Sequence, residues 1–257
     1  MTTAKINGYT MHYIDHGKGT AILFIHPPVL TSLNFTYQIQ ALSPYFRTIA
    51  FDIRGHGKSQ SSEQTVTYPL IVEDIKQLMD HLCIDKFHVC GYSTGGSIVL
   101  EFLLTYPDRA LGGIIISGMS EVNGWWLRNK ISLGVVFSKI GAVSSIALSN
   151  AWTQTKDISL FRKLFNDSKK GNARNAKQYY TYSLKYNCTS KLGKINLPTL
   201  LVYGEKDKNF HSYADMLQQR LPKSELVFIK KVDHRIPTKA SESLNELIKS
   251  FVQRVVH

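Results

Sequence analysis

The feature that most constrains the fold is a glycine-rich turn, GYSTGG at residues 91–96, which lies between two apolar segments. Residues 86–90 before the turn predict a buried strand, and residues 94–106 after it predict a helix. A serine at a tight strand-to-helix turn takes strained backbone angles, and glycines two residues before and after it relieve the crowding. The motif therefore predicts a sharp corner that raises the Ser93 hydroxyl clear of a sheet.

The rest of the chain alternates between strand-like and helix-like segments. Asn7-Gly8 between two strand-like segments predicts a hairpin, which would place antiparallel strands at one edge of a sheet. Helical spacing is clearest at residues 69–82. Strands that alternate with helices indicate an α/β fold with a mostly parallel central sheet and helices on both faces. Apolar runs of strand length occur at residues 21–25, 48–51, 111–116, 199–203 and 225–229.

Residues 121–187 interrupt this alternation. They contain no clear strand, several helical stretches and many aromatic residues, and we interpret them as a helical cap (lid) inserted into a core domain of residues 1–120 and 188–257. Between residues 121 and 190 we count eleven basic residues against three acidic ones, in a chain with 31 Lys+Arg and 19 Asp+Glu. A solvated helical face explains this excess most simply, and the charge would also attract anionic substrates.

A serine hydroxyl is a weak nucleophile without a base, and His234 is the candidate base. It lies in the segment VDHRIP (232–237), at the carboxyl end of the predicted sheet, where sites in open α/β folds gather. Asp207 follows a strand that reaches the same edge, while Glu205 is a competitor earlier in that turn. We expect Ser93 as nucleophile, His234 as proton carrier and Asp207 as the orienting carboxylate.

Further motifs agree with this assignment. DIRGHGKS at 52–59, LGKINLP at 192–198 and His-x-x-Pro at 234–237 accompany the GYSTGG turn, and the order Ser, Asp, His follows the chain. Together they resemble the α/β-hydrolase superfamily over essentially the whole length. The resemblance implies an esterase-like serine hydrolase that cleaves a small ester through an acyl-enzyme on Ser93. An aspartate at this position would have indicated an epoxide hydrolase or a dehalogenase.

The resemblance also implies an oxyanion hole with two N–H donors. One donor is the residue after the nucleophile, Thr94. The second usually comes from a His-Gly-x loop, but residues 26–28 read HPP, and the matching donor, Pro28, has no N–H. Either the loop shifts so that the Val29 N–H substitutes, or the hole is weak, and loss of one donor costs on the order of 10²–10³ in rate.

Three aromatic residues are candidates for the substrate pocket. Tyr92 adjoins Ser93, and Trp125 and Trp126 stand near the start of the predicted cap. Packing between the cap and the core is an equal alternative for the two tryptophans.

The composition indicates a cytoplasmic enzyme. The cysteines, Cys83, Cys90 and Cys188, are scattered and indicate free thiols in a reducing compartment. We see no secretory signal and no apolar run long enough to cross a bilayer. The predicted chemistry needs neither a metal nor an organic cofactor. The expected partner is a small ester-like molecule rather than nucleic acid, and the sequence makes no prediction of the oligomeric state.

Two other functions use the same residues. A ligand receptor built on a hydrolase fold would turn over about once per molecule; the HPP loop favours this reading and the intact triad opposes it. A perhydrolase or a C–C bond hydrolase would keep the triad, and an oxidation that depends on acetate and peroxide would identify the former.

Overall fold

The computed structural model describes residues 2–154 and 157–255. A single sheet crosses the molecule with the strand order β1-β2-β4-β3-β5-β6-β7-β8. The pairs β1–β2 and β2–β4 are antiparallel, and the pairs from β4 to β8 are parallel. The strands are β1 (Thr2–Ile6), β2 (Tyr9–His16), β3 (Ala21–Ile25), β4 (Arg47–Phe51), β5 (Phe87–Tyr92), β6 (Ala110–Ile116), β7 (Thr199–Gly204) and β8 (Ser224–Ile229).

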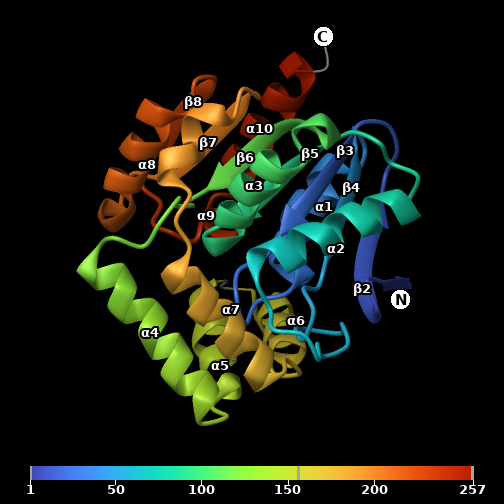
Figure 1. Cartoon of the computed structure of the whole chain (residues 1–257), viewed down its shortest axis with the longest axis vertical. Helices are drawn as coiled ribbons and strands as arrows, with labels where there is room; N and C mark the ends of the chain where they lie inside the picture. The colour runs from blue at the N-terminus through green and yellow to red at the C-terminus, as the bar shows by residue number, and fades with distance from the viewer. Residues whose placement is uncertain (1, 155–156, 256–257) are drawn as a thin grey trace.

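Helices cover both faces of this sheet. In Figure 1, α2, α3 and α8 lie in front of the strands, and α1 and α10 lie behind them. This arrangement confirms the predicted α/β class with a mostly parallel sheet. The helices are α1 (Thr36–Leu42), α2 (Tyr68–His81), α3 (Thr94–Thr105), α4 (Trp125–Lys139), α5 (Val143–Gln154), α6 (Ile158–Ser168), α7 (Ala173–Lys185), α8 (Lys208–Arg220), α9 (Ile236–Lys239) and α10 (Ser241–Val255).

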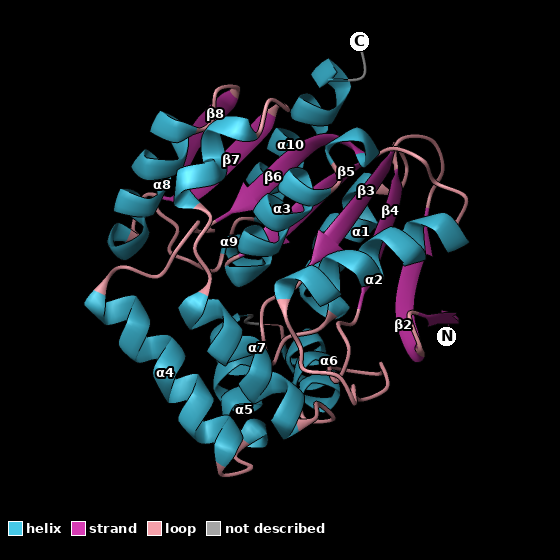
Figure 2. Ribbon diagram, in the orientation of Figure 1, coloured by secondary structure: helices cyan, strands magenta, loops and turns pink. Residues whose placement is uncertain are grey.

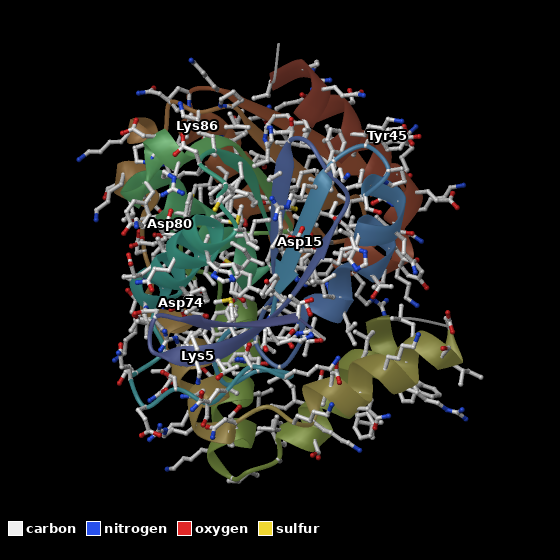
Figure 3. All side chains as sticks on the ribbon, turned by 90° about the vertical axis from the view of Figure 1, so that its right-hand side faces the viewer. Lys5, Asp15, Tyr45, Asp74, Asp80 and Lys86 are labelled. Atoms are coloured by element: carbon white, nitrogen blue, oxygen red, sulfur yellow. The ribbon has the colours of Figure 1, made fainter. Side chains whose placement is uncertain are left out.

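The predicted hairpin forms the outer edge of the sheet. Asn7 and Gly8 both have positive φ, 44° and 80°, as a two-residue turn between twisted strands requires. The hairpin faces the viewer in Figure 3, where Lys5 marks β1 and Asp15 marks β2. Because β2 also pairs with β4, the antiparallel edge continues directly into the parallel part of the sheet.

The central strands are buried on both faces, which explains their uninterrupted apolar sequences. All five residues of β3 and all six residues of β5 are buried. Full burial of one large apolar side chain contributes about 1.5–3 kcal/mol, so these strands form a rigid base for the loops at their carboxyl ends.

The helices α4–α7 come between β6 and β7 and lie together at one end of the sheet, as Figure 2 shows. Glu121 and Asn187 pair in an isolated bridge where this segment leaves and rejoins the core. Hydrogen bonds connect α7 to the loops after β3 and β4. Tyr179 Oη donates to the His26 carbonyl at 3.1 Å, and Ser62 N donates to Asn175 Oδ1 at 2.9 Å.

Candidate active site

Ser93 occupies a strained corner between β5 and α3. Its φ and ψ are 55° and −121°, outside the regions that most residues adopt. A Cβ on Gly91 would lie 2.2 Å from the Gly95 carbonyl oxygen, and one on Gly95 would lie 2.3 Å from the Ile25 carbonyl oxygen. The two glycines are therefore required by close approach of the backbone. This geometry confirms the predicted strand-turn-helix structure of residues 91–96.

The structure brings Ser93, Asp207 and His234 together. The His234 ring lies with Nε2 3.1 Å from Ser93 Oγ and Nδ1 2.7 Å from Asp207 Oδ2. The three residues come from the ends of β5, β7 and β8, which meet at one edge of the parallel sheet. A carboxylate only accepts hydrogen bonds, so Nδ1 carries a proton and Nε2 of the neutral ring faces the hydroxyl.

Aromatic rings enclose the His234 imidazole. Its centroid lies 4.2 Å from that of Phe210 and 5.3 Å from that of Tyr92. Burial lowers the pKa of His234 below its ordinary value of 6.5, and the hydrogen bond to Asp207 opposes this shift. The neutral, proton-accepting ring is thus the form that prevails near pH 7.

The two other nearby carboxylates are engaged elsewhere. Glu205, the sequence competitor, accepts a hydrogen bond from Lys231 N at 2.9 Å. Asp233 accepts from Nε of Arg235 at 2.9 Å, and its pKa is lowered to about 2, mainly by that side chain. Asp207 is therefore the carboxylate hydrogen-bonded to His234.

The loop after β3 approaches the same corner. Leu30 N donates to the Pro27 carbonyl at 3.3 Å, and φ of Val29 is 61°. Since proline fixes φ of Pro28 near −65°, residues 27–30 form a type II turn, whose third position normally requires glycine. A β-branched residue in that conformation is strained by roughly 1–3 kcal/mol. Val29 is buried, and its N–H has no acceptor within residues 2–154 and 157–255.

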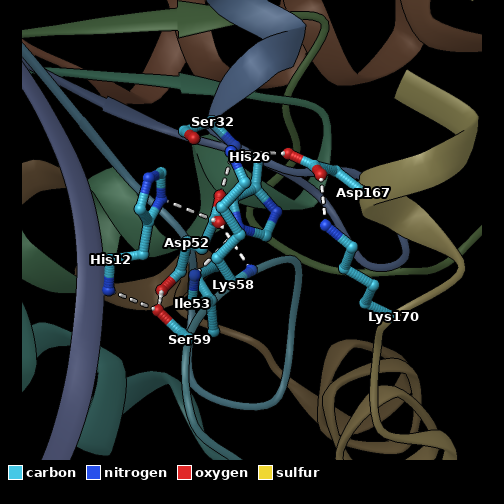
Figure 4. A network of polar contacts seen from close by, with 9 residues as sticks. All are labelled: His12, His26, Ser32, Asp52, Ile53, Lys58, Ser59, Asp167 and Lys170. Carbon is cyan, nitrogen blue, oxygen red and sulfur yellow. Dashed lines mark hydrogen bonds and ion pairs between the residues drawn. The ribbon is translucent and has the colours of Figure 1, made fainter. Parts of the chain in front are cut away.

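His26 holds this loop against the segment that follows β4. Ile53 N donates to His26 Nε2 at 2.9 Å (Figure 4). The opposite ring nitrogen lies 2.8 Å from the Pro27 carbonyl oxygen. A neutral ring with its proton on Nδ1 satisfies both contacts. Burial lowers the pKa of His26, which favours that neutral form.

Asp52, just after β4, is the centre of a second part of the network in Figure 4. Its carboxylate accepts from Ser32 N at 2.8 Å, Lys58 N at 2.9 Å and His12 Nδ1 at 3.1 Å. Burial by itself would raise the pKa of Asp52, but the contacts with His12, His26 and the two N–H groups lower it to about 2. A buried carboxylate therefore links the loop after β4 to strand β2 and to the segment at Ser32.

A cavity of about 750 Å³ opens above Ser93. Pro28, Tyr92, Thr94 and Trp126 line it, whereas Trp125 is 79% exposed and lies outside its lining. Much of the remaining wall is apolar and comes from α4, α5 and the core, including Leu30, Met119, Leu127, Ile131, Leu133, Phe137 and Ile146.

Sequence reasoning missed two lining residues close to the triad. Phe210, whose ring packs at a tilt against that of His234, follows Asp207 by three residues, so its position in the first turn of α8 was the available signal. Lys130 faces the cavity from α4, but nothing in the sequence distinguishes it from the other lysines of residues 121–187.

Two features are absent from the described ranges, 2–154 and 157–255. No helix there has the length and apolar character needed to span a membrane. No group of three or more His, Cys, Asp or Glu side chains in these ranges could hold a metal ion.

Comparison with known proteins agrees with this architecture. A family model described as alpha/beta hydrolase fold matches residues 20–138. The chain is 34% identical over 108 residues to a soluble epoxide hydrolase of Corynebacterium sp. (strain C12). This alignment covers 42% of this chain and 37% of that protein. The chain is 25% identical over 234 residues to epoxide hydrolase 3 of Mus musculus, with 80% of this chain and 63% of the relative covered.

A solved structure matches nearly the whole fold. The esterase EaEST of Exiguobacterium antarcticum superposes with a TM-score of 0.88 at 20% identity, covering 98% of this chain and 99% of that one. At this identity the likeness establishes the fold rather than the substrate. The protein has the alpha/beta hydrolase fold, and the family model over residues 20–138 and the curated relatives support the α/β-hydrolase superfamily.

Proposed function

We propose that the protein is a serine hydrolase that cleaves a small carboxylic ester through an acyl-enzyme on Ser93. The observation that carries this proposal is the continuous hydrogen-bonded arrangement from Ser93 Oγ through His234 to Asp207 at the floor of the cavity. The epoxide hydrolases among the relatives share the superfamily, but the nucleophile turn here carries a serine, which favours acyl transfer.

The reaction has two halves. His234 Nε2 accepts the Ser93 proton as Oγ bonds to the ester carbonyl carbon, and the carbonyl electrons move to oxygen. When the tetrahedral intermediate collapses, the bond to the alcohol oxygen breaks and His234 returns the proton to that oxygen. Water then attacks the acyl-enzyme by the same steps, releasing the acid and regenerating Ser93. Asp207 fixes the tautomer of His234 and stabilises its protonated form.

We assign the oxyanion to the N–H groups of Thr94 and Val29. Thr94 is the first residue of α3, so its N–H has no partner inside the helix, and the helix dipole favours a developing anion there. The strained turn at residues 27–30 holds a buried Val29 N–H that lacks an acceptor within the described ranges. The strain and the unpaired N–H both favour Val29, one residue beyond Pro28, as the residue that supplies the second oxyanion donor.

We further propose that residues 121–187 act as the cap, with residues 1–120 and 188–257 as the core. The bridge between Glu121 and Asn187 supports this division because it closes the segment at its base. The α4 and α5 side chains that line the cavity support a role of the cap in substrate selection.

The test is labelling with a fluorophosphonate probe, followed by the mass of the intact protein. We expect one adduct in the wild type, none in Ser93→Ala and slow labelling in His234→Ala. Ser145→Ala is the matched control because Ser145 lines the same cavity without a hydrogen bond to His234, and it should label normally. p-Nitrophenyl esters should then turn over many times.

Three outcomes would contradict the proposal. An unlabelled wild type would mean that Ser93 is not activated. Labelling with about one ester event per molecule would favour a receptor instead. Oxidation that requires acetate and peroxide, with little net ester hydrolysis, would assign the triad to perhydrolysis.

A further inference from the structure

The charged side chains around the cavity carry an excess of positive charge. Both lining carboxylates already have partners: Asp207 bonds to His234, and Asp233 bonds to Arg235. Two lysines remain, and neither forms an ion pair within residues 2–154 and 157–255. They are Lys130 on α4 and Lys206 in the loop that carries Asp207.

Lys130 is the better placed of the two lysines to meet a ligand. Its Nζ lies 4.9 Å from the centroid of the Trp126 ring, which also lines the cavity. Burial lowers the pKa of Lys130, and the charges of Asp207, Arg235 and Asp233 are close enough to act on it. The ammonium group is thus partly desolvated beside the reacting groups while remaining accessible, and an anion would compensate its charge.

The rest of α4 presents an apolar wall to the same cavity. From Lys130 the lining continues through Ile131, Leu133 and Gly134 to Phe137. At 1.5 Å per residue this wall extends about 10 Å beyond the lysine. The cavity therefore offers one positive end next to the triad and one apolar end under α4 and α5.

We propose that the substrate is an amphipathic ester that carries a carboxylate, and that Lys130 is the residue that selects it. This inference rests on the proposed function of Ser93. The substrate carboxylate bonds to Lys130 Nζ near the reacting carbonyl, and the apolar part lies along α4 towards Phe137. Of the basic side chains of residues 121–187 that the structure describes, Lys130 alone lines the cavity, so selection by charge does not depend on the wider basic surface.

The experiment compares esters that are nearly isosteric and differ in charge. 4-Acetoxybenzoate and 4-acetoxybenzamide place the charge on the leaving group. The mono-p-nitrophenyl ester of adipic acid and the p-nitrophenyl ester of adipamic acid place it on the acyl group. The measured quantity is the ratio of kcat/KM for the anionic ester over the neutral ester within each pair, after subtraction of spontaneous hydrolysis.

We expect the wild type to prefer the anionic member of at least one pair, and Lys130→Met to lower that ratio about tenfold. A tenfold change is at the lower end of what a hydrogen bond to a charged group contributes to binding. We expect the lower end because solvent still reaches Lys130. Lys130→Arg should keep most of the preference. Lys139→Met is the matched control: it removes the same charge from the same helix at an exposed position outside the cavity, and it should leave the ratio unchanged.

Salt gives a second readout. Raising NaCl from 50 to 500 mM should reduce the preference in the wild type and have little effect on the ratio in Lys130→Met. An enzyme that hydrolyses both members of each pair equally, or a preference that Lys130→Met retains, overturns this inference while the serine hydrolase assignment stands. Absence of any ester cleavage and of any fluorophosphonate adduct overturns the proposed function itself.

Discussion

Replacing Asp52 with asparagine tests the buried network that holds the loops around the nucleophile. The carboxylate accepts hydrogen bonds from Ser32 N, Lys58 N and His12 Nδ1, and these donors use both of its oxygens. In asparagine an NH₂ group replaces one oxygen, so at least one of these donors would face another donor and lose its acceptor. The pKa of Asp52 is about 2 in the folded protein against an ordinary value of 3.8. At about 1.4 kcal/mol per pH unit, this difference corresponds to about 2 kcal/mol of stability at neutral pH.

The sign of the pH dependence follows from the lowered pKa. The stabilisation is complete above the unfolded-state pKa, near 4, and is lost as the pH falls through the folded-state value, near 2. We therefore expect Asp52→Asn to lower the free energy of unfolding by about 2–3 kcal/mol at pH 7, and by progressively less between pH 4 and pH 2.

Urea unfolding followed by tryptophan fluorescence at pH 7, 5, 4 and 3 measures this difference. The denaturant midpoint should fall without a change in the m-value. Asp85→Asn is the control, because the Asp85 side chain is 85% exposed and should contribute less than about 0.5 kcal/mol. A destabilisation by Asp52→Asn that is equally large at every pH would refute the role given to the ionised carboxylate.

Three further predictions concern catalysis. Because burial lowers the pKa of His234, kcat/KM for ester hydrolysis should stay constant near neutral pH and fall only below about 6.5, where the ring becomes protonated; a pH–rate profile with its acid limb above 7 would contradict this. Pro28→Ala introduces an N–H, yet kcat for p-nitrophenyl acetate should change less than about threefold if Val29 already supplies the second donor. A gain of about 10²-fold would show that the wild-type hole lacks one. Gly95→Ala places a Cβ 2.3 Å from a β3 carbonyl oxygen and should slow fluorophosphonate labelling at least about 100-fold, whereas Gly193→Ala, with open space around it, should label at the wild-type rate.

The sequence predicted the fold because the deciding patterns are local. The apolar runs of the central strands, the Asn7-Gly8 turn and the GYSTGG corner each specify their own backbone, and the structure confirms them. The start of α8 was less visible. Its first turn is polar apart from Phe210, so an apolar helical periodicity in the sequence is clear only from about Tyr213, although the helix begins at Lys208.

The candidate site was predictable only where one residue could be assigned by its position after a strand. Ser93, Asp207 and His234 follow β5, β7 and β8, and the structure places them within hydrogen-bonding distance; their catalytic roles stay a prediction. Lys130 and Trp126 line the cavity because of how α4 is rotated against α7, and Trp125 points away for the same reason. That rotation depends on packing between distant segments, which no local pattern encodes.

The helices of residues 121–187 are held to the core at more than one place. Tyr179 and Asn175 on α7 form hydrogen bonds with the loops after β3 and β4, and Gly124 N at the start of α4 donates to Tyr213 Oη at 2.9 Å. Val143 and Ala147 of α5 are buried in one cluster with Val29 and Ala176. The turn that contains Val29 therefore supports both the proposed oxyanion donor and the α5 wall of the cavity, so the chemistry and the selection of chain length would be coupled through one loop.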